Sequence, residues 1–110
     1  MIGMWIYALQ RATAFVLAPL VLVHLGLIVY AVRGGLSAEE ILSRTQGSVG
    51  WALFYGVFVV AAAVHGAIGV RSVLTEWTPI GEHGAGAAAG LLGIALLALG
   101  LRAVWAVVGG

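Results

Sequence analysis

This sequence of 110 residues contains no cysteine, no lysine and no aspartate. Without cysteine, the chain cannot form disulfides, thiolate-bound zinc sites, iron–sulfur clusters or covalent c-type haem. Without lysine, and with five scattered arginines, it lacks the clustered positive charge of nucleic-acid-binding proteins, so no nucleic-acid partner is expected. Carboxylate chemistry is restricted to four residues: Glu39, Glu40, Glu76 and Glu82.

Charge of either sign is also scarce. Charged residues make up 8% of the chain and apolar residues 63%, whereas about a quarter of a typical globular protein is charged. A soluble domain of this size must expose much of its surface, and nine charged side chains cannot cover it. The composition therefore predicts that lipid surrounds most of the chain.

Three long runs carry no formal charge: residues 12–32, 48–70 and 84–101. As helices these runs measure roughly 27–35 Å, which matches a hydrocarbon core of about 30 Å. Helices satisfy their own backbone in lipid, and the runs lack the alternation of barrel strands. We therefore expect an all-α membrane protein, a single domain over residues 1–110 with three transmembrane helices. The expected spans are about residues 11–33, 48–76 and 84–106.

The connections between the spans also carry signals. Ser37 and Glu40 have the spacing of a capping box, which predicts a short interfacial helix over residues 37–44. After the second span, Thr78 and Pro79 should end the helix, and residues 81–84 (Gly-Glu-His-Gly) should turn the chain. His83 is therefore expected in a solvated loop.

Small residues recur every four positions in the third span. Gly86 and Gly90 form one such pair, and Ala89 and Gly93 form another. Spacing of this kind lets helix backbones approach closely in membranes. We expect this pattern to serve helix packing.

Two histidines, His24 and His65, lie inside predicted spans, where polar residues are costly and usually functional. Histidine is also a common axial ligand of haem iron. Gly66 follows His65, and the neighbours of His65 on its helix face are mostly small: Ala61, Ala62, Ile68 and Gly69. The corresponding neighbours of His24 are all bulky: Leu20, Val21, Leu27 and Ile28. His65 is the candidate ligand, beside a trough for a flat macrocycle, and the alternative role is a hydrogen bond between helices. For His24 such a hydrogen bond is the expected role.

The depths of these histidines differ. Counted from Arg11 and Arg71 at the same interface, His24 lies 13 residues inside and His65 lies 6 residues inside. At about 1.5 Å per residue, the depths are roughly 20 Å and 9 Å. One haem cannot take both as axial ligands, so a haem on His65 needs its second ligand from another chain.

Polar residues continue from His65 toward the interface along one helix stripe. The stripe runs through Gly69, Ser72 and Glu76, and its flanks carry Arg71, Thr75 and Trp77. Hydrogen-bond donors beside an aromatic wall are typical of a quinone head-group pocket. Arg11 and Arg71 are either interfacial anchors or ligands of a haem propionate or a quinone.

Two segments carry a resemblance to a known family. Residues 10–14 read Gln-Arg-Ala-Thr-Ala, and residues 65–79 read His-Gly-Ala-Ile-Gly-Val-Arg-Ser-Val-Leu-Thr-Glu-Trp-Thr-Pro. With these motifs the chain resembles the smaller, cytochrome b-associated membrane-anchor subunit of succinate dehydrogenase. The resemblance covers essentially the whole chain, although the third span matches in character only.

The resemblance implies roles for four residues. The family's haem b, shared with a partner anchor, has its axial histidine at the position of His65. An arginine near the haem propionates and the quinone pocket corresponds to Arg11. The acidic–aromatic pair that borders the ubiquinone site corresponds to Glu76 and Trp77. The family commonly has Asp-Tyr there, and tryptophan offers an indole N–H in place of the tyrosine hydroxyl.

By this resemblance, the chain is a non-catalytic membrane-anchor subunit of a succinate:quinone oxidoreductase in the bacterial inner membrane. The implied partners are a second, cytochrome b anchor, an iron–sulfur subunit and a flavoprotein subunit. Haem b is the implied cofactor and quinone the implied substrate. The alternatives are a fumarate reductase anchor and a haem-free membrane transport or assembly subunit.

Overall fold

Four helices make up the structure, a computed structural model that describes residues 2–109. They are α1 (Ile2–Arg33), α2 (Ala38–Thr45), α3 (Val49–Trp77) and α4 (Gly81–Val108). Each of the three long helices is apolar enough to cross a membrane, and residues 2–109 contain no strand. The predicted all-α class, with three long apolar helices and a short helix after the first, is confirmed.

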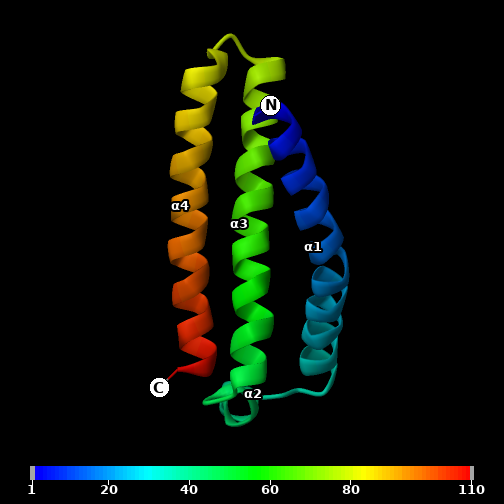
Figure 1. The fold of residues 1–110 in the computed structure, drawn as a ribbon. Helices are drawn as coiled ribbons and strands as arrows, with labels where there is room; N and C mark the ends of the chain where they lie inside the picture. Colours follow the sequence, from blue (N-terminus) through cyan, green and yellow to red (C-terminus); the bar gives the residue numbers. More distant parts are fainter. Residues whose placement is uncertain (1, 110) are drawn as a thin grey trace.

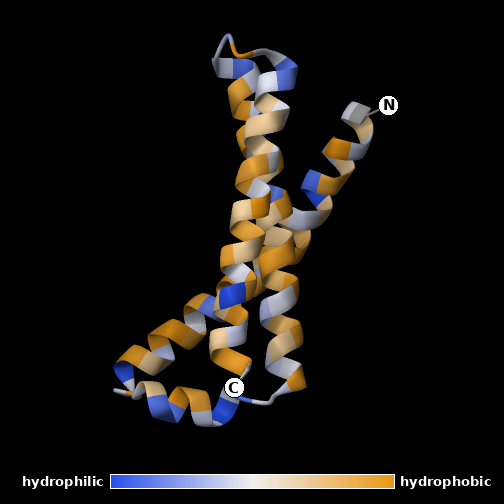
Figure 2. Ribbon diagram, turned by 90° about the vertical axis from the view of Figure 1, so that its left-hand side faces the viewer, coloured by the Kyte–Doolittle hydropathy of each residue, from blue (hydrophilic) through white to orange (hydrophobic). Residues whose placement is uncertain are grey.

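α3 lies between α1 and α4 and runs antiparallel to both of them (Figure 1). The N-terminus lies at the same end as the α3–α4 connection, and the C-terminus lies at the opposite end, near α2 (Figure 1). α1 crosses the α3–α4 pair obliquely, so that both of its ends diverge from the pair (Figure 2). The middle of α1 therefore carries its closest contacts with α3.

Pro19 lies inside α1 without ending the helix. Proline removes one backbone N–H and clashes with the carbonyl four residues earlier, which bends a helix. The axis of α1 changes direction in the middle part of the helix, the part that contains Pro19 (Figure 1). This bend contributes to the oblique path of α1.

Small residues hold α3 and α4 together. The buried apolar residues of the described chain are all alanines: Ala61, Ala63, Ala85 and Ala89. A Cβ added at Gly93 would lie 3.1 Å from the Cβ of Ala67, so the close approach depends on glycine there. The predicted small-residue pattern is correct for Ala89 and Gly93. At Gly86 and Gly90 an added Cβ would meet nothing within 4 Å in the described chain, so a packing role there stays a prediction.

α2 is the short helix predicted over residues 37–44, and its two faces differ in polarity. The hydroxyl of Ser37 accepts the backbone N–H of Glu40 at 3.2 Å, and the carboxylate of Glu40 accepts the backbone N–H of Ser37 at 3.3 Å. Glu39, Glu40 and Arg44 are exposed, whereas Leu42 is half-buried. The capping box expected from the sequence is therefore present, with the charges facing outward.

The end of α2 is fastened to the end of α4. Thr45 is buried, and its hydroxyl donates to the carbonyl of Val107 at 2.7 Å. The backbone N–H of Gly47 donates to the carbonyl of Val108 at 2.8 Å. The last carbonyls of a helix have no partner within it, so these two bonds satisfy groups that α4 cannot satisfy itself. We call this pair of hydrogen bonds the α2–α4 latch.

The connection between α3 and α4 differs from the prediction. α3 ends at Trp77, as expected, but α4 begins at Gly81 rather than near residue 84. Residues 81–84 are therefore helical and do not turn the chain; the turn lies at residues 78–80. Gly81 has a φ of +79°, a conformation open to glycine, which allows the sharp reversal. His83 is exposed as expected, but in the first turn of a helix.

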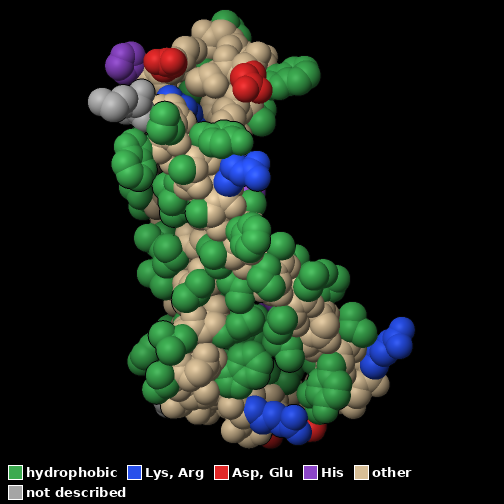
Figure 3. All heavy atoms as spheres, turned by 45° about the vertical axis from the view of Figure 1, so that its right-hand side comes forward, with side chains coloured by type: hydrophobic (Ala, Val, Ile, Leu, Met, Phe, Trp, Pro, Cys, Tyr) green, Lys and Arg blue, Asp and Glu red, His purple; other side chains and the backbone are tan. Residues whose placement is uncertain are grey.

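Charged side chains lie toward the two ends of the molecule, and hydrophobic side chains dominate its middle (Figure 3). Large apolar residues such as Phe15, Leu22 and Leu91 are exposed along the helices. A contiguous apolar surface of this extent marks contact with lipid or other proteins.

Candidate functional site

His65 lies on α3 and faces the middle of α1. Its ring nitrogen Nδ1 is 3.1 Å from the hydroxyl oxygen of Thr13. Thr13 is only 8% exposed, and its hydroxyl also lies 2.9 Å from the carbonyl of Leu9 and 3.0 Å from the carbonyl of Gln10. The imidazole is thus attached to α1 through one nitrogen. The other nitrogen, Nε2, makes no hydrogen bond within residues 2–109.

Gln10 makes the second polar contact between the two helices. Its side-chain Nε2 donates to the backbone carbonyl of His65 at 3.3 Å. Its oxygen Oε1 is buried and has no hydrogen-bond partner among the described residues. A buried polar atom without a partner is costly. Gln10 therefore offers a hydrogen-bond acceptor beside His65 that the described chain does not use.

A pocket of about 370 Å³ opens beside His65. We call it the His65 trough, and its lining residues are Gln10, His65, Gly66, Gly69, Val70, Val73 and Leu74. Two of these residues are glycines, so the helix backbone itself forms part of the wall. A Cβ at Gly66 would lie 3.3 Å from Leu96 of α4, and one at Gly69 would lie 3.6 Å from Gln10 of α1. The predicted trough is present on the side of Gly66 and Gly69. Ala61 and Ala62, which were expected to share it, do not line it.

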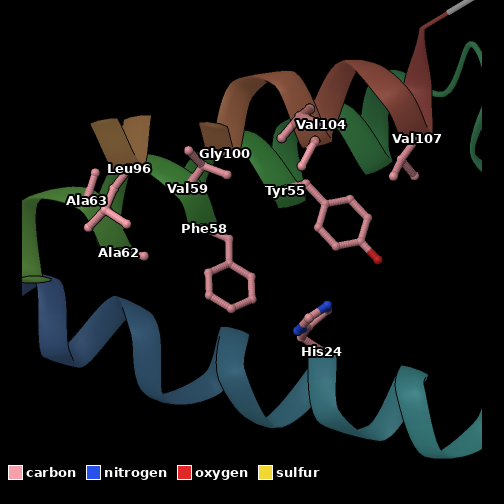
Figure 4. A pocket seen from close by; sticks show the side chains of 11 residues that line it. His24, Tyr55, Phe58, Val59, Ala62, Ala63, Leu96, Gly100, Val104 and Val107 are labelled. Carbon is pink, nitrogen blue, oxygen red and sulfur yellow. The ribbon is translucent and has the colours of Figure 1, made fainter. Parts of the chain in front are cut away.

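His24 faces α3 at a different level. Its ring meets Tyr55 and Phe58 edge-on, at centroid distances of 5.9 Å and 5.2 Å. No hydrogen bond of His24 is found within the described chain, so the expected interhelical hydrogen bond is not observed there. His24 and Tyr55 instead face a second pocket of about 380 Å³, which is walled by apolar residues of α3 and α4 (Figure 4). The sequence did not predict this pocket, because most of its walls lie on α3 and α4, whereas His24 lies on α1.

These contacts fix the register of α1 against α3. Thr13 lies opposite His65, whereas His24 lies opposite Tyr55 and Phe58. His65 is seven residues from Phe58 along α3, a separation of about 10 Å in a helix. The difference in depth between the two histidines thus agrees with the value expected from the sequence.

The four other predicted site residues lie toward the end of the molecule that carries the α3–α4 connection. Arg11 is exposed, and its guanidinium contacts Tyr7, one turn earlier on α1, rather than His65. Arg71 is half-buried near the end of α3, Glu76 is exposed, and Trp77 is 81% exposed. Among residues 2–109 no salt bridge joins these side chains, and none of the four lines the His65 trough. Their functional roles stay predictions.

Gln10 and Thr13 are the contacts that sequence analysis did not assign. Both lie in the segment 10–14 that carries the family resemblance. The available signal was a pair of polar side chains three positions apart, which places them on one face of a helix. What the sequence does not give is the register that brings this face to His65.

Comparison with known proteins agrees with the architecture. The chain matches the family of the succinate dehydrogenase/fumarate reductase transmembrane subunit over residues 1–107. Comparison with curated proteins gave no match, and neither did comparison with solved structures. The matched segment includes α1, α2, α3 and nearly all of α4. The chain therefore belongs to the succinate dehydrogenase/fumarate reductase transmembrane subunit family and is a multi-pass membrane protein.

Proposed function

We propose that this chain anchors a succinate:quinone oxidoreductase in the bacterial inner membrane. In this role, it supplies His65 as one axial ligand of a haem b and forms part of a quinone pocket. Family membership makes the chain a subunit of a succinate dehydrogenase/fumarate reductase complex. The observation that carries the more specific proposal is the imidazole of His65, attached through Nδ1 to Thr13 beside a glycine-lined trough.

The residues around His65 fit one half of a haem site. A histidine bound through one ring nitrogen to a second group is the usual arrangement of a metal-ligating histidine. Gly66 and Gly69 line the trough without side chains, which would let a flat group approach the helix backbone, and the unused acceptor of Gln10 adds a polar contact. A haem b held there would accept and release single electrons.

A second chain is needed to complete this site. His24 lies about 10 Å further along the helix pair, which is too far to share one iron with His65. We therefore assign the second axial ligand to a partner anchor, the cytochrome b subunit.

The quinone pocket is assigned to the end of α3. Arg71, Glu76 and Trp77 lie within seven residues of one another there. Arg71 and the indole N–H of Trp77 can donate hydrogen bonds to quinone oxygens, and Glu76 can hold a proton. Arg11, on the neighbouring turns of α1, provides a second positive charge for a haem propionate or a quinone.

The chain performs no chemistry alone in this proposal. It has no cysteine for iron–sulfur clusters, so the electrons must come from a flavoprotein subunit through an iron–sulfur subunit. The family includes fumarate reductase subunits as well, and the reverse reaction would use the same contacts.

Purification of the native complex from membranes tests the proposal. We expect the chain to copurify with a flavoprotein, an iron–sulfur protein and a second membrane subunit. Succinate should then reduce a haem b in this complex, and a quinone should reoxidise it. A complex that transfers electrons to quinone but contains no haem b would contradict the assignment of His65 as a haem ligand.

A further inference from the structure

Thr13 is one of two buried polar side chains in the described chain, together with Thr45 of the α2–α4 latch. Its hydroxyl oxygen lies close to three polar atoms: the carbonyl oxygens of Leu9 and Gln10, at 2.9 Å and 3.0 Å, and Nδ1 of His65, at 3.1 Å. The two carbonyls belong to the preceding turn of the same helix. All three distances are those of hydrogen bonds.

A hydroxyl carries a single hydrogen, and this decides the direction of the bond to His65. If Thr13 donated to Nδ1, its lone pairs would face two carbonyl oxygens at 2.9 Å and 3.0 Å without a hydrogen between them. If it donates to those carbonyls, its lone pair is free to accept from Nδ1–H. In the second arrangement the one hydrogen of Thr13 lies between oxygen acceptors, and no two acceptors face each other without a hydrogen. This arrangement favours the form of His65 with its hydrogen on Nδ1 and its lone pair on Nε2.

We propose that Thr13 is the positioning residue of the His65 site. Its hydroxyl, directed by the carbonyls of its own helix, holds the imidazole in the Nδ1–H form and directs the Nε2 lone pair toward the metal. This inference rests on the proposed function, because it assumes that His65 binds haem iron. Thr13 touches neither the iron nor the quinone in this arrangement.

The side chain at position 13 suits this role. A β-branched residue in a helix has few rotamers, and threonine in particular can bond the carbonyl three or four residues earlier. A hydroxyl oxygen that accepts from Nδ1–H also increases the electron density that the imidazole gives to a metal. In an apolar span, no water replaces this acceptor if it is lost.

Two variants of nearly the same size separate the hydroxyl from the packing. Thr13→Val keeps the shape and removes the acceptor, whereas Thr13→Ser keeps the acceptor and removes a methyl group. Both are compared with wild type in the intact complex, by haem content per complex and by the midpoint potential of the haem. Loss of an outer hydrogen-bond partner commonly weakens metal binding about 10- to 100-fold.

We expect Thr13→Ser to resemble wild type in both measurements. Thr13→Val should have a lower haem content, and its remaining haem should have a higher midpoint potential, because the ferric form loses more stabilisation than the ferrous form. If the preference of the site for ferric over ferrous haem falls tenfold, the midpoint potential rises by about 59 mV, since one electron is transferred. If Thr13→Val does not assemble, Thr13→Ala is compared with Thr13→Ser in the same way.

Equal haem content and equal midpoint potential in Thr13→Val and wild type would overturn the inference. A His65→Ala variant distinguishes this result from failure of the proposed function. If His65→Ala loses the haem while Thr13→Val is unchanged, His65 is a ligand and Thr13 does not position it. If His65→Ala keeps the haem, the proposed function and the inference both fail.

Discussion

Gly69 lines the His65 trough, so side chains of increasing size at this position should leave less room for haem. A Cβ at position 69 would lie 3.6 Å from the side-chain nitrogen of Gln10, an ordinary contact distance. Gly69→Ala should therefore fold without strain and gain up to about 1 kcal/mol in helix propensity. Because the alanine methyl group stays close to the backbone, haem content should be unchanged.

Gly69→Leu should behave differently. Each further carbon lies about 1.5 Å beyond Cβ, so the leucine side chain must either displace Gln10 or turn into the trough. Overpacking of this kind costs about 1–3 kcal/mol, and a side chain in the trough occupies the place proposed for the porphyrin. We expect haem content, measured as haemochrome per purified complex, to fall strongly in this variant.

Gly56→Leu is the matched control on the same helix. A Cβ at Gly56 would meet nothing within 4 Å, so this variant should assemble with a normal haem content. Full haem content in Gly69→Leu would refute the assignment of the trough to the porphyrin. Loss of haem in Gly69→Ala, with normal assembly, would show that the trough is narrower than the structure gives.

Two further predictions concern other parts of the chain. Thr45→Val keeps the shape of the side chain and removes the hydroxyl of the α2–α4 latch, so it should lower the free energy of unfolding by about 1 kcal/mol, whereas Thr45→Ser should not. Thermal unfolding in detergent measures this difference. If both variants were as stable as wild type, the hydroxyl of Thr45 would add nothing to stability. Trp77→Ala should raise the apparent KM for quinone with succinate–dye activity retained, and unchanged quinone kinetics would remove the exposed Trp77 from the quinone pocket.

Much of the architecture follows from local features of the sequence. Uncharged runs of membrane-spanning length predict the three long helices, because lipid provides no partner for a free backbone. Ser37 and Glu40 predict the start of α2, because a capping box depends only on residues three positions apart. Gly69 beside His65 predicts a shallow helix face for the same reason, since both residues lie on one helix.

The features that the sequence did not predict arise between helices. α4 begins earlier than expected because the chain reverses at residues 78–80, where the positive φ of Gly81 allows a sharp turn. The residues after Gly81 are therefore free to be helical. The pocket at His24 is formed by α3 and α4, and the contacts of Gln10 and Thr13 with His65 depend on how α1 crosses α3. Packing of this kind depends on all three helices together.

The proposed function requires that His65, and not His24, binds the haem iron. The most direct measurement is the reduced-minus-oxidised haem b spectrum of the intact complex carrying His65→Ala, with His24→Ala as the matched control. We expect His65→Ala to lose the haem b signal and His24→Ala to keep it. An unchanged spectrum in His65→Ala would show that His65 does not bind the haem iron.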